Sequence, residues 1–306
     1  MLYPQTETCQ TNVVAAPHDT MIETVLFPVD FSPYSIAMAG FVKRAAVMLR
    51  ASVSLLHVFD PISHNGFEGV ERPISEIAED RLGVARDRLH NFLRAEFPVA
   101  EFPRLLFSGN AAAGITQCAQ EGPFGLIVMP THAGRFRRMF LGSTTEKVLN
   151  KVDCPVLTTQ HADVTVPRPL EHRIWACAVS LKADSERVLR QASEAASAVG
   201  AKLILFHALD SQQPKSPDRL RRQDIEQIPS ETTARRRLEE LESTVGCEAE
   251  VIVSAGETDQ ILLEGVRKYS ADTLITGRGS GLGVPGRMSR LTYVLIRDSP
   301  CPVLSV

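Results

Sequence analysis

The fold is decided by residues 24–60, TVLFPVDFSPYSIAMAGFVKRAAVMLRASVSLLHVFD, because the same pattern returns 150 positions later. The second occurrence, residues 174–210, reads IWACAVSLKADSERVLRQASEAASAVGAKLILFHALD. Further along, FGLIVMP, which ends at Pro130, matches ADTLITG, which ends at Gly277, at an offset of 147. The chain is therefore a tandem duplication of a unit of roughly 140 residues, which is within the usual size of one domain.

Each unit alternates strand-like and helix-like segments. The first unit has strand-like runs at residues 24–29, 53–59, 101–107, 126–129 and 155–159, and helix-like runs at 33–50, 75–96, 111–120 and 143–151. Strands that alternate with helices of this length imply right-handed crossovers and a parallel sheet covered on both faces. We therefore predict an α/β fold with two tandem copies of a five-stranded, parallel-sheet, Rossmann-like α/β/α sandwich.

The repeat also predicts the domain boundaries. We expect two domains at residues 21–160 and 173–306. Residues 1–20 are polar, unpatterned and outside the repeat, so we expect a flexible extension there. Residues 161–172 are polar, carry two prolines and have no periodicity, which is typical of an interdomain linker.

Composition narrows the class of protein. A net charge of −3 indicates no polyanionic partner, so we expect no binding to nucleic acid. The six cysteines show no CxxC or Cys/His spacing, which is typical of thiols in a reducing compartment. The opening residues lack the pattern of a signal peptide, and no segment is apolar for long enough to span a bilayer. We therefore expect a cytoplasmic protein without a membrane partner.

The strand ends are the predicted ligand site. In parallel α/β sheets, ligands bind beyond the carboxyl ends of the strands, at the point where the strand order reverses. In the first copy these ends are Asp30, Val58, Gly109 and the Met129–Pro130 pair. Asp30 is the best functional candidate, because its counterpart in the second copy is not acidic; a capping role shared with Ser32 is the alternative.

The loop after the fourth strand carries the chemistry. Residues 130–144 read PTHAGRFRRMFLGST, so that Gly142 is followed by two hydroxyl residues at the start of a helix. Such a turn can surround an anion with backbone N–H groups and hydroxyls. Three arginines in the same loop add positive charge. The loop therefore predicts a phosphate cradle, although the chain has no Walker motif GxxxxGK[ST].

At this point the chain resembles the universal stress protein family, in particular its tandem two-domain members. The resemblance rests on the segments VLFPVDFSPYS, LLHVFD, LIVMPTH, LGSTTEKVL and CPVLTT, which occur in order in the first copy. It covers nearly all of residues 22–160 and, more loosely, residues 172–306. The resemblance implies the adenine nucleotide alpha hydrolase-like variant of the fold and, in many members, a site for ATP or another adenine nucleotide.

Ten positions form the site that the resemblance implies. They are Pro28, Asp30, Val58, Met129, Pro130, His132, Gly134, Gly142, Ser143 and Thr144. The first two would border the adenosine, and Val58 would offer backbone groups to the base. Met129 and Pro130 would line the turn, and Gly142 with the two hydroxyl residues after it would hold the phosphates, with Mg²⁺ as a possible companion. The alternative for His132 is a surface loop histidine without a binding role.

The first copy departs from the family fingerprint, which is a glycine, two residues, a glycine, nine residues, and a glycine with serine or threonine. Pro130 stands at the first glycine position and has no N–H to donate. Ala133 stands at the second, unless Gly134 replaces it through a gap, and the following stretch is one residue short. Losing one phosphate donor costs about 1–3 kcal/mol, which weakens binding without abolishing it.

The second copy departs further. Ser180 replaces the strand-end aspartate, and Arg290-Leu291 replaces the hydroxyl residues of the turn. We therefore predict that the second copy has lost the site. His57 and His207 end their strands in both copies whatever the state of the loop, which favours a structural role, a histidine satisfied at the sheet edge, over catalysis.

Three functions remain open. The first is a nucleotide-responsive stress or signalling module, the second a slow ATP hydrolase, and the third a structural interaction protein that binds no nucleotide. No catalytic triad, metal cluster or carboxylate pair marks the chain as an enzyme. The final strand of each copy is a candidate edge, so we expect the copies to form an internal pseudo-dimer and two chains to associate as a homodimer.

Overall fold

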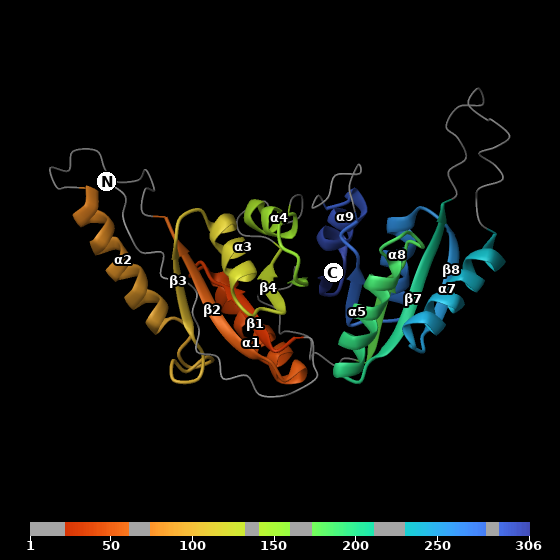
Figure 1. The fold of residues 1–306 in the computed structure, drawn as a ribbon, viewed down its shortest axis with the longest axis horizontal. Coiled ribbons are helices and arrows are strands. Elements are labelled where there is room, and N and C mark those ends of the chain that lie inside the picture. Colours follow the sequence, from red (N-terminus) through yellow and green to blue (C-terminus); the bar gives the residue numbers. More distant parts are fainter. Residues whose placement is uncertain (1–21, 61–73, 132–140, 160–172, 211–229, 280–287) are drawn as a thin grey trace, which may run out of the picture.

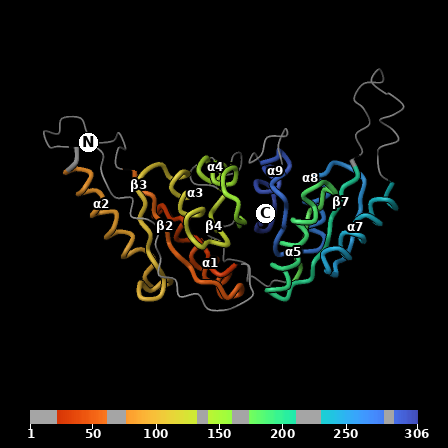
Figure 2. Tube along the Cα trace, viewed as in Figure 1, coloured from red at the N-terminus to blue at the C-terminus, as the bar shows by residue number. Residues whose placement is uncertain are grey.

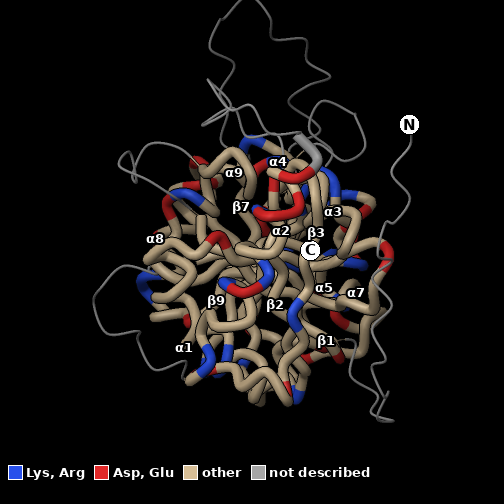
Figure 3. The backbone as a smooth tube through the Cα atoms, turned by 90° about the vertical axis from the view of Figure 1, so that its left-hand side faces the viewer, with Lys and Arg blue, Asp and Glu red and all other residues tan. Residues whose placement is uncertain are grey.

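The computed structural model describes residues 22–60, 74–131, 141–159, 173–210, 230–279 and 288–306. The predicted N-terminal extension and the predicted linker lie outside these ranges, as do His132, Gly134 and the three arginines of the loop. Acidic and basic residues are interspersed along the described elements (Figure 3).

Two copies of one α/β unit follow each other (Figure 1). The first contains β1 (Thr24–Pro28), α1 (Pro33–Leu49), β2 (Ser52–Phe59), α2 (Ile74–Asn91), β3 (Arg104–Ser108), α3 (Ala111–Glu121), β4 (Leu126–Pro130), α4 (Ser143–Leu149) and β5 (Val156–Thr159). The second contains β6 (Ile174–Ala178), α5 (Ser185–Ala198), β7 (Lys202–Asp210), α7 (Glu231–Val245), β8 (Glu250–Gly256), α8 (Thr258–Lys268), β9 (Thr273–Thr276), α9 (Arg290–Asp298) and β10 (Val303–Ser305). The predicted fold class is confirmed.

Local sequence explains where α1 begins and ends. Ser32 is the N-cap, its hydroxyl accepts the N–H of Ser35 at 3.3 Å, and Pro33 takes the first helical position. The helix ends at Arg50, which adopts a left-handed conformation with φ 53°. The capping role that the sequence analysis gave to Ser32 is therefore confirmed.

The segment after α2 differs from its prediction. The helix ends at Asn91 and β3 begins at Arg104, so that both elements are shorter than predicted. The chain between them folds around Phe97, which is fully buried and packs against Phe27 with 6.1 Å between ring centroids. The guanidinium of Arg104 donates to the carbonyl of Phe97 at 2.6 Å. A single tertiary contact of this kind leaves no periodic signal in the sequence.

All strands join one ten-stranded sheet in the order β3-β2-β1-β4-β5-β10-β9-β6-β7-β8. The pairs within each half are parallel, and the halves meet through the antiparallel pair of β5 and β10, in which Leu157 lies opposite Leu304. The C-terminus therefore lies in the middle of the molecule (Figure 1). The predicted internal pseudo-dimer is confirmed.

This pairing uses the final strand of each copy, which the sequence analysis named as a candidate edge. The strands β5 and β10 lie in the centre of the sheet, and the strands at its two ends are β3 and β8. Because the backbone groups of β5 and β10 already pair with each other, a second copy of the chain would have to bind through another surface. The homodimer remains a prediction.

The helices form two layers. One buried cluster lies between the sheet and the helices α1, α2, α5 and α7, and a second lies between the sheet and α3, α4, α8 and α9. Across the middle of the molecule α1 faces α5 in the first layer, and α4 faces α9 in the second (Figure 2). The loops at the start of α4 and α9 therefore lie near the boundary between the copies.

Candidate functional site

The seam between β1 and β4 is the point where the strand order of the first copy reverses. These strands share two residue pairs, the last of which is Leu26 with Ile127. The corresponding seam of the second copy, between β6 and β9, has four pairs and continues to Ala178 with Thr276. The hydrogen-bonded ladder of the first copy therefore stops before the carboxyl ends of the strands, where this fold class binds ligands.

Two prolines account for the early end of the β1–β4 ladder. Backbone N–H groups point alternately to the two sides of a strand. The N–H of Val29 donates to Leu56 on β2, so the nitrogen of Pro28 faces β4. The N–H of Thr131 donates to a carbonyl of β5, so the nitrogen of Pro130 faces β1. Both prolines thus stand where the seam would need donors.

Neither proline has an N–H, so the ladder cannot extend past them. The second copy has Ala178 and Gly277 at these positions, and its ladder extends. The sequence analysis counted Pro130 as a lost phosphate donor. Its place in the seam adds a second effect, because the same substitution helps to end the β1–β4 ladder early. The paired prolines could have been noticed by comparing the copies at both strand ends.

The second copy also fills the end of its seam. A Cβ atom on Gly277 would come within 2.8 Å of Val188 Cγ2 and 3.3 Å of Asp184 Oδ2, both from the start of α5. These side chains therefore lie against the strand end.

Asp30 lies at the mouth of the first seam and is exposed. Its Oδ1 accepts the Ser35 hydroxyl at 2.6 Å and the Ser32 N–H at 3.0 Å. Burial alone would raise the pKa of Asp30, but the hydrogen bonds from Ser32 and Ser35 outweigh it and lower the pKa. The carboxylate is therefore charged at neutral pH, and both of these bonds are made to Oδ1.

Asp30 thus has the local role that the sequence analysis gave as its alternative, and its side chain is charged and exposed as well. In the second copy Ser180 makes the same local contacts more weakly, at 3.4 Å to the Ser185 hydroxyl and 3.4 Å to the Lys182 N–H. A hydroxyl in that place has no second acceptor oxygen and no charge.

The two histidines have the same role in both copies. Nδ1 of His57 lies 2.8 Å from the carbonyl of Val29, and Nδ1 of His207 lies 2.8 Å from that of Val179. The predicted structural role is therefore confirmed, and the histidines lie at the carboxyl ends of internal strands.

The histidine contact also leaves Val58 accessible from the β1 side. A continuing ladder would direct the N–H of Val58 to the carbonyl of Val29, but the imidazole of His57 takes that carbonyl. The β1–β2 pairing ends at Pro28 with Leu56. The backbone groups of Val58 therefore face the space beyond β1, as the proposed contact with a base requires.

The loop after the fourth strand, which the sequence predicts to bind phosphate, is closed by the same two hydrogen bonds in both copies. In the first copy Gly142 N–H donates to Thr131 O at 2.8 Å, and Thr145 Oγ1 donates to Pro130 O at 3.0 Å. The second copy repeats these bonds at 2.8 Å and 2.9 Å, with Ser289 and Thr292 in the same places. The two loops therefore have equal length and differ in what stands at the closing turn.

Gly142 is the decisive difference at that turn. In the second copy the Ser289 hydroxyl caps α9 by accepting the N–H of Thr292 at 3.1 Å. Gly142 has no side chain, and α4 has no side-chain cap. Its φ of −59° is open to any residue, so the missing side chain matters rather than glycine's freedom. The first-turn N–H groups, including those of Ser143 and Thr144, are left to water or a ligand.

Within the described ranges no group of three or more His, Cys, Asp or Glu residues could hold a metal ion. No described helix is long and apolar enough to cross a membrane.

His57 predicts a pH effect on stability. Burial lowers the pKa of His57 below its ordinary value of 6.5, and the charge of Arg88 acts in the same direction against the opposing effects of Val29 and Asp30. The folded state thus binds the proton less readily than the unfolded chain, so the contribution is full above about pH 6.5 and is lost as the pH falls through the folded pKa.

We expect His57→Asn, which can keep a donor to Val29, to flatten the loss of unfolding free energy between about pH 7 and pH 5. Urea titrations of both proteins at several pH values measure this. Equal pH slopes for the two proteins would assign the effect to another group.

The fold and this site define a tandem, doubly wound α/β protein whose first copy has a shortened β1–β4 ladder and a turn without a side-chain cap. A sequence model of the universal stress protein family matches residues 21–160 and again residues 174–306. The chain therefore belongs to the universal stress protein family, as the resemblance indicated.

Individual relatives agree with this placement. A Thermus aquaticus protein named "Universal stress protein in QAH/OAS sulfhydrylase 3'region" is 29% identical over 138 residues, which is 45% of this chain and 98% of that protein. The crystal structure of a universal stress protein from Archaeoglobus fulgidus DSM 4304 has a TM-score of 0.63 at 20% identity, covering 94% of this chain and 97% of its own. A functionally unknown protein from Pseudomonas aeruginosa PAO1 has a TM-score of 0.59 at 17% identity, covering 93% and 92%. The two structures share the fold along both copies.

Proposed function

We propose that this protein binds ATP, or another adenine nucleotide, in its first domain and acts as a nucleotide-responsive module in stress response or signalling. The observation that carries the proposal is the coincidence of two features in one copy. The β1–β4 ladder ends before the strand ends, and the turn at Gly142 lacks the side-chain cap of its counterpart. In the second copy the β6–β9 ladder continues to Ala178 with Thr276, and Ser289 caps the turn.

The residues of the first copy suit the parts of such a ligand. Oδ2 of Asp30 would accept a hydrogen bond from a ribose hydroxyl or an exocyclic amine. The outward-facing backbone groups of Val58 would pair with the base. The N–H groups and hydroxyls of Ser143 and Thr144 would donate to phosphate oxygens. Mg²⁺ would accompany the phosphates and neutralise part of their charge.

The proposal places the protein in the cytoplasm. Three of the described cysteines, Cys118, Cys177 and Cys301, are buried. Burial raises the pKa of the Cys177 thiol to about 12, so this sulfur stays protonated and unreactive. Buried thiols of this kind are typical of proteins in a reducing compartment.

Nucleotide binding can be tested on the purified full chain. We expect mass spectrometry of the denatured protein to release ATP or AMP, and calorimetry with ATP and magnesium to give about one site per chain. Asp30→Ala is expected to weaken binding by about tenfold, because a charged acceptor is lost. Absence of nucleotide even after soaking with ATP would favour a structural interaction protein, and a stoichiometry of two would show that the second copy binds as well.

A further inference from the structure

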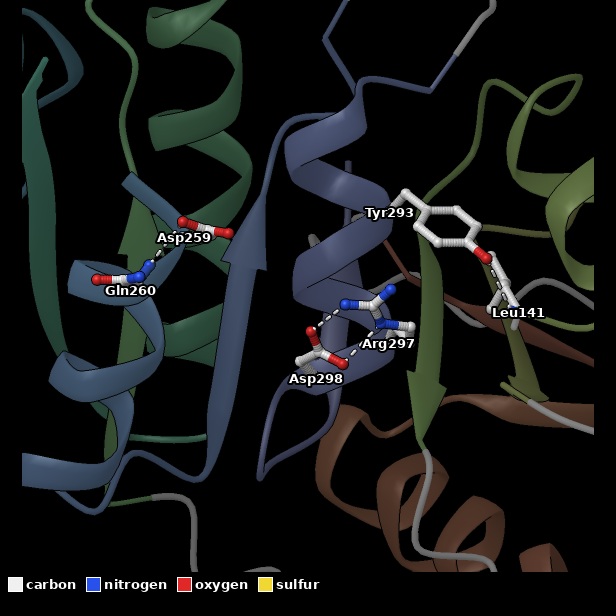
Figure 4. Close-up of polar contacts among 6 residues, drawn as sticks. All are labelled: Leu141, Asp259, Gln260, Tyr293, Arg297 and Asp298. Atoms are coloured by element: carbon white, nitrogen blue, oxygen red, sulfur yellow. Dashed lines mark hydrogen bonds and ion pairs between the residues drawn. The ribbon is translucent and has the colours of Figure 1, made fainter. Parts of the chain in front are cut away.

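The second domain contacts the phosphate turn of the first. The hydroxyl of Tyr293, on α9, accepts the backbone N–H of Leu141 at 3.2 Å (Figure 4). Leu141 is buried and directly precedes Gly142. The contact therefore crosses the domain boundary and ends one residue from the turn that is proposed to hold phosphate.

A twin contact runs in the opposite direction. Met288, which precedes Ser289 in the second copy, donates its N–H to Oδ1 of Asn150 in the first copy at 2.5 Å. Each loop is thus held at its last residue by a side chain of the other domain. Because Ser289 already caps its own helix, the contact through Asn150 supports a turn in which the N–H of Thr292 is taken by a side chain.

The two contacts use different residues of the repeat. At the offset of 147, Tyr293 corresponds to Glu146, and Asn150 corresponds to Arg297. The Arg297 guanidinium binds Asp298 at 2.7 and 2.5 Å (Figure 4). The hydroxyl that contacts Leu141 is therefore a feature of the second copy alone. It contacts the first copy, which is the one proposed to bind a nucleotide.

We propose that Tyr293 is a positioning residue through which the second domain holds the phosphate turn of the first and so regulates nucleotide binding. The inference rests on the proposed function. The N–H of Leu141 is in a buried residue, so leaving it without an acceptor is costly, and a turn fixed at this point presents its donors without further loss of entropy. Because coupling between sites is reciprocal, an occupied turn would in the same way strengthen the docking of the two domains.

The substitution Tyr293→Phe tests this, because it removes the acceptor and keeps the ring. We expect the affinity of the full chain for ATP to fall by about fivefold or more, and the affinity for adenosine, which has no phosphate, to stay within about twofold. Exchange of the Leu141 amide hydrogen, measured without nucleotide, is expected to become faster. Tyr269→Phe is the matched control, because this tyrosine lies in the same domain and packs against Phe206.

The outcomes separate the two proposals. Unchanged ATP affinity in Tyr293→Phe, or an equal loss for ATP and adenosine, would overturn the positioning role and leave the proposed function in place. A wild-type chain that binds neither ligand would overturn the proposed function, and this inference with it.

Discussion

Replacing Gly142 by serine is expected to weaken ATP binding by about tenfold to a hundredfold without unfolding the protein. A serine there would cap α4 as Ser289 caps α9, taking the N–H of Thr145 and placing a side chain where a phosphate would approach. Loss of one donor costs about 1–3 kcal/mol, and each 1.4 kcal/mol is about tenfold in affinity. Because serine is the better cap, the unfolding free energy should rise by about a few tenths of a kcal/mol.

The opposite signs make this test informative, because a general loss of structure would lower both quantities. Isothermal calorimetry with ATP and urea unfolding measure them on the same samples. The reciprocal change Ser289→Gly is the matched control, and it should lower stability slightly while ATP binding stays as in the wild type. A Gly142→Ser protein that binds ATP like the wild type would show that the phosphates lie elsewhere.

Replacing Arg278 by alanine is expected to lower the free energy of unfolding by about 2–4 kcal/mol, the largest effect on stability that we predict. Its guanidinium crosses the domain boundary and donates to the carbonyls of Val152 and Cys154 in the first copy, and at 3.3 Å to Ser305 on β10. Burial lowers the pKa of Arg278 to about 10, which still leaves it charged at neutral pH. Alanine would leave these carbonyls without their donor beside the β5–β10 pair.

Urea unfolding of the full chain measures the loss. Arg190→Ala is the matched control, because Arg190 forms an exposed ion pair with Glu186 at 2.8 Å, and such pairs contribute about 0–1 kcal/mol. Similar small losses for both variants would contradict the role of Arg278 in holding the two domains together.

Much of this molecule could be predicted because the signals are local or repeated. The alternation of strand-like and helix-like runs, the Ser32–Pro33 cap and the strand-end aspartate Asp30 all depend on a few neighbouring residues. The errors lie in the segment between α2 and β3, where α2 ends at Asn91 and the chain folds around the buried Phe97. Comparison of the copies predicted which one keeps the site, but it missed the seam, where Pro28 and Pro130 end the β1–β4 ladder of the first copy.

The sequence by itself determined the duplication, the α/β class and the asymmetry between the copies, since each follows from residue patterns along the chain. Only the tertiary structure decided that the nitrogens of Pro28 and Pro130 face the same seam, because the direction of an N–H depends on which strands become neighbours. It also decided that Tyr293 reaches Leu141, since the antiparallel pairing of β5 with β10 brings together loops that lie far apart in the chain.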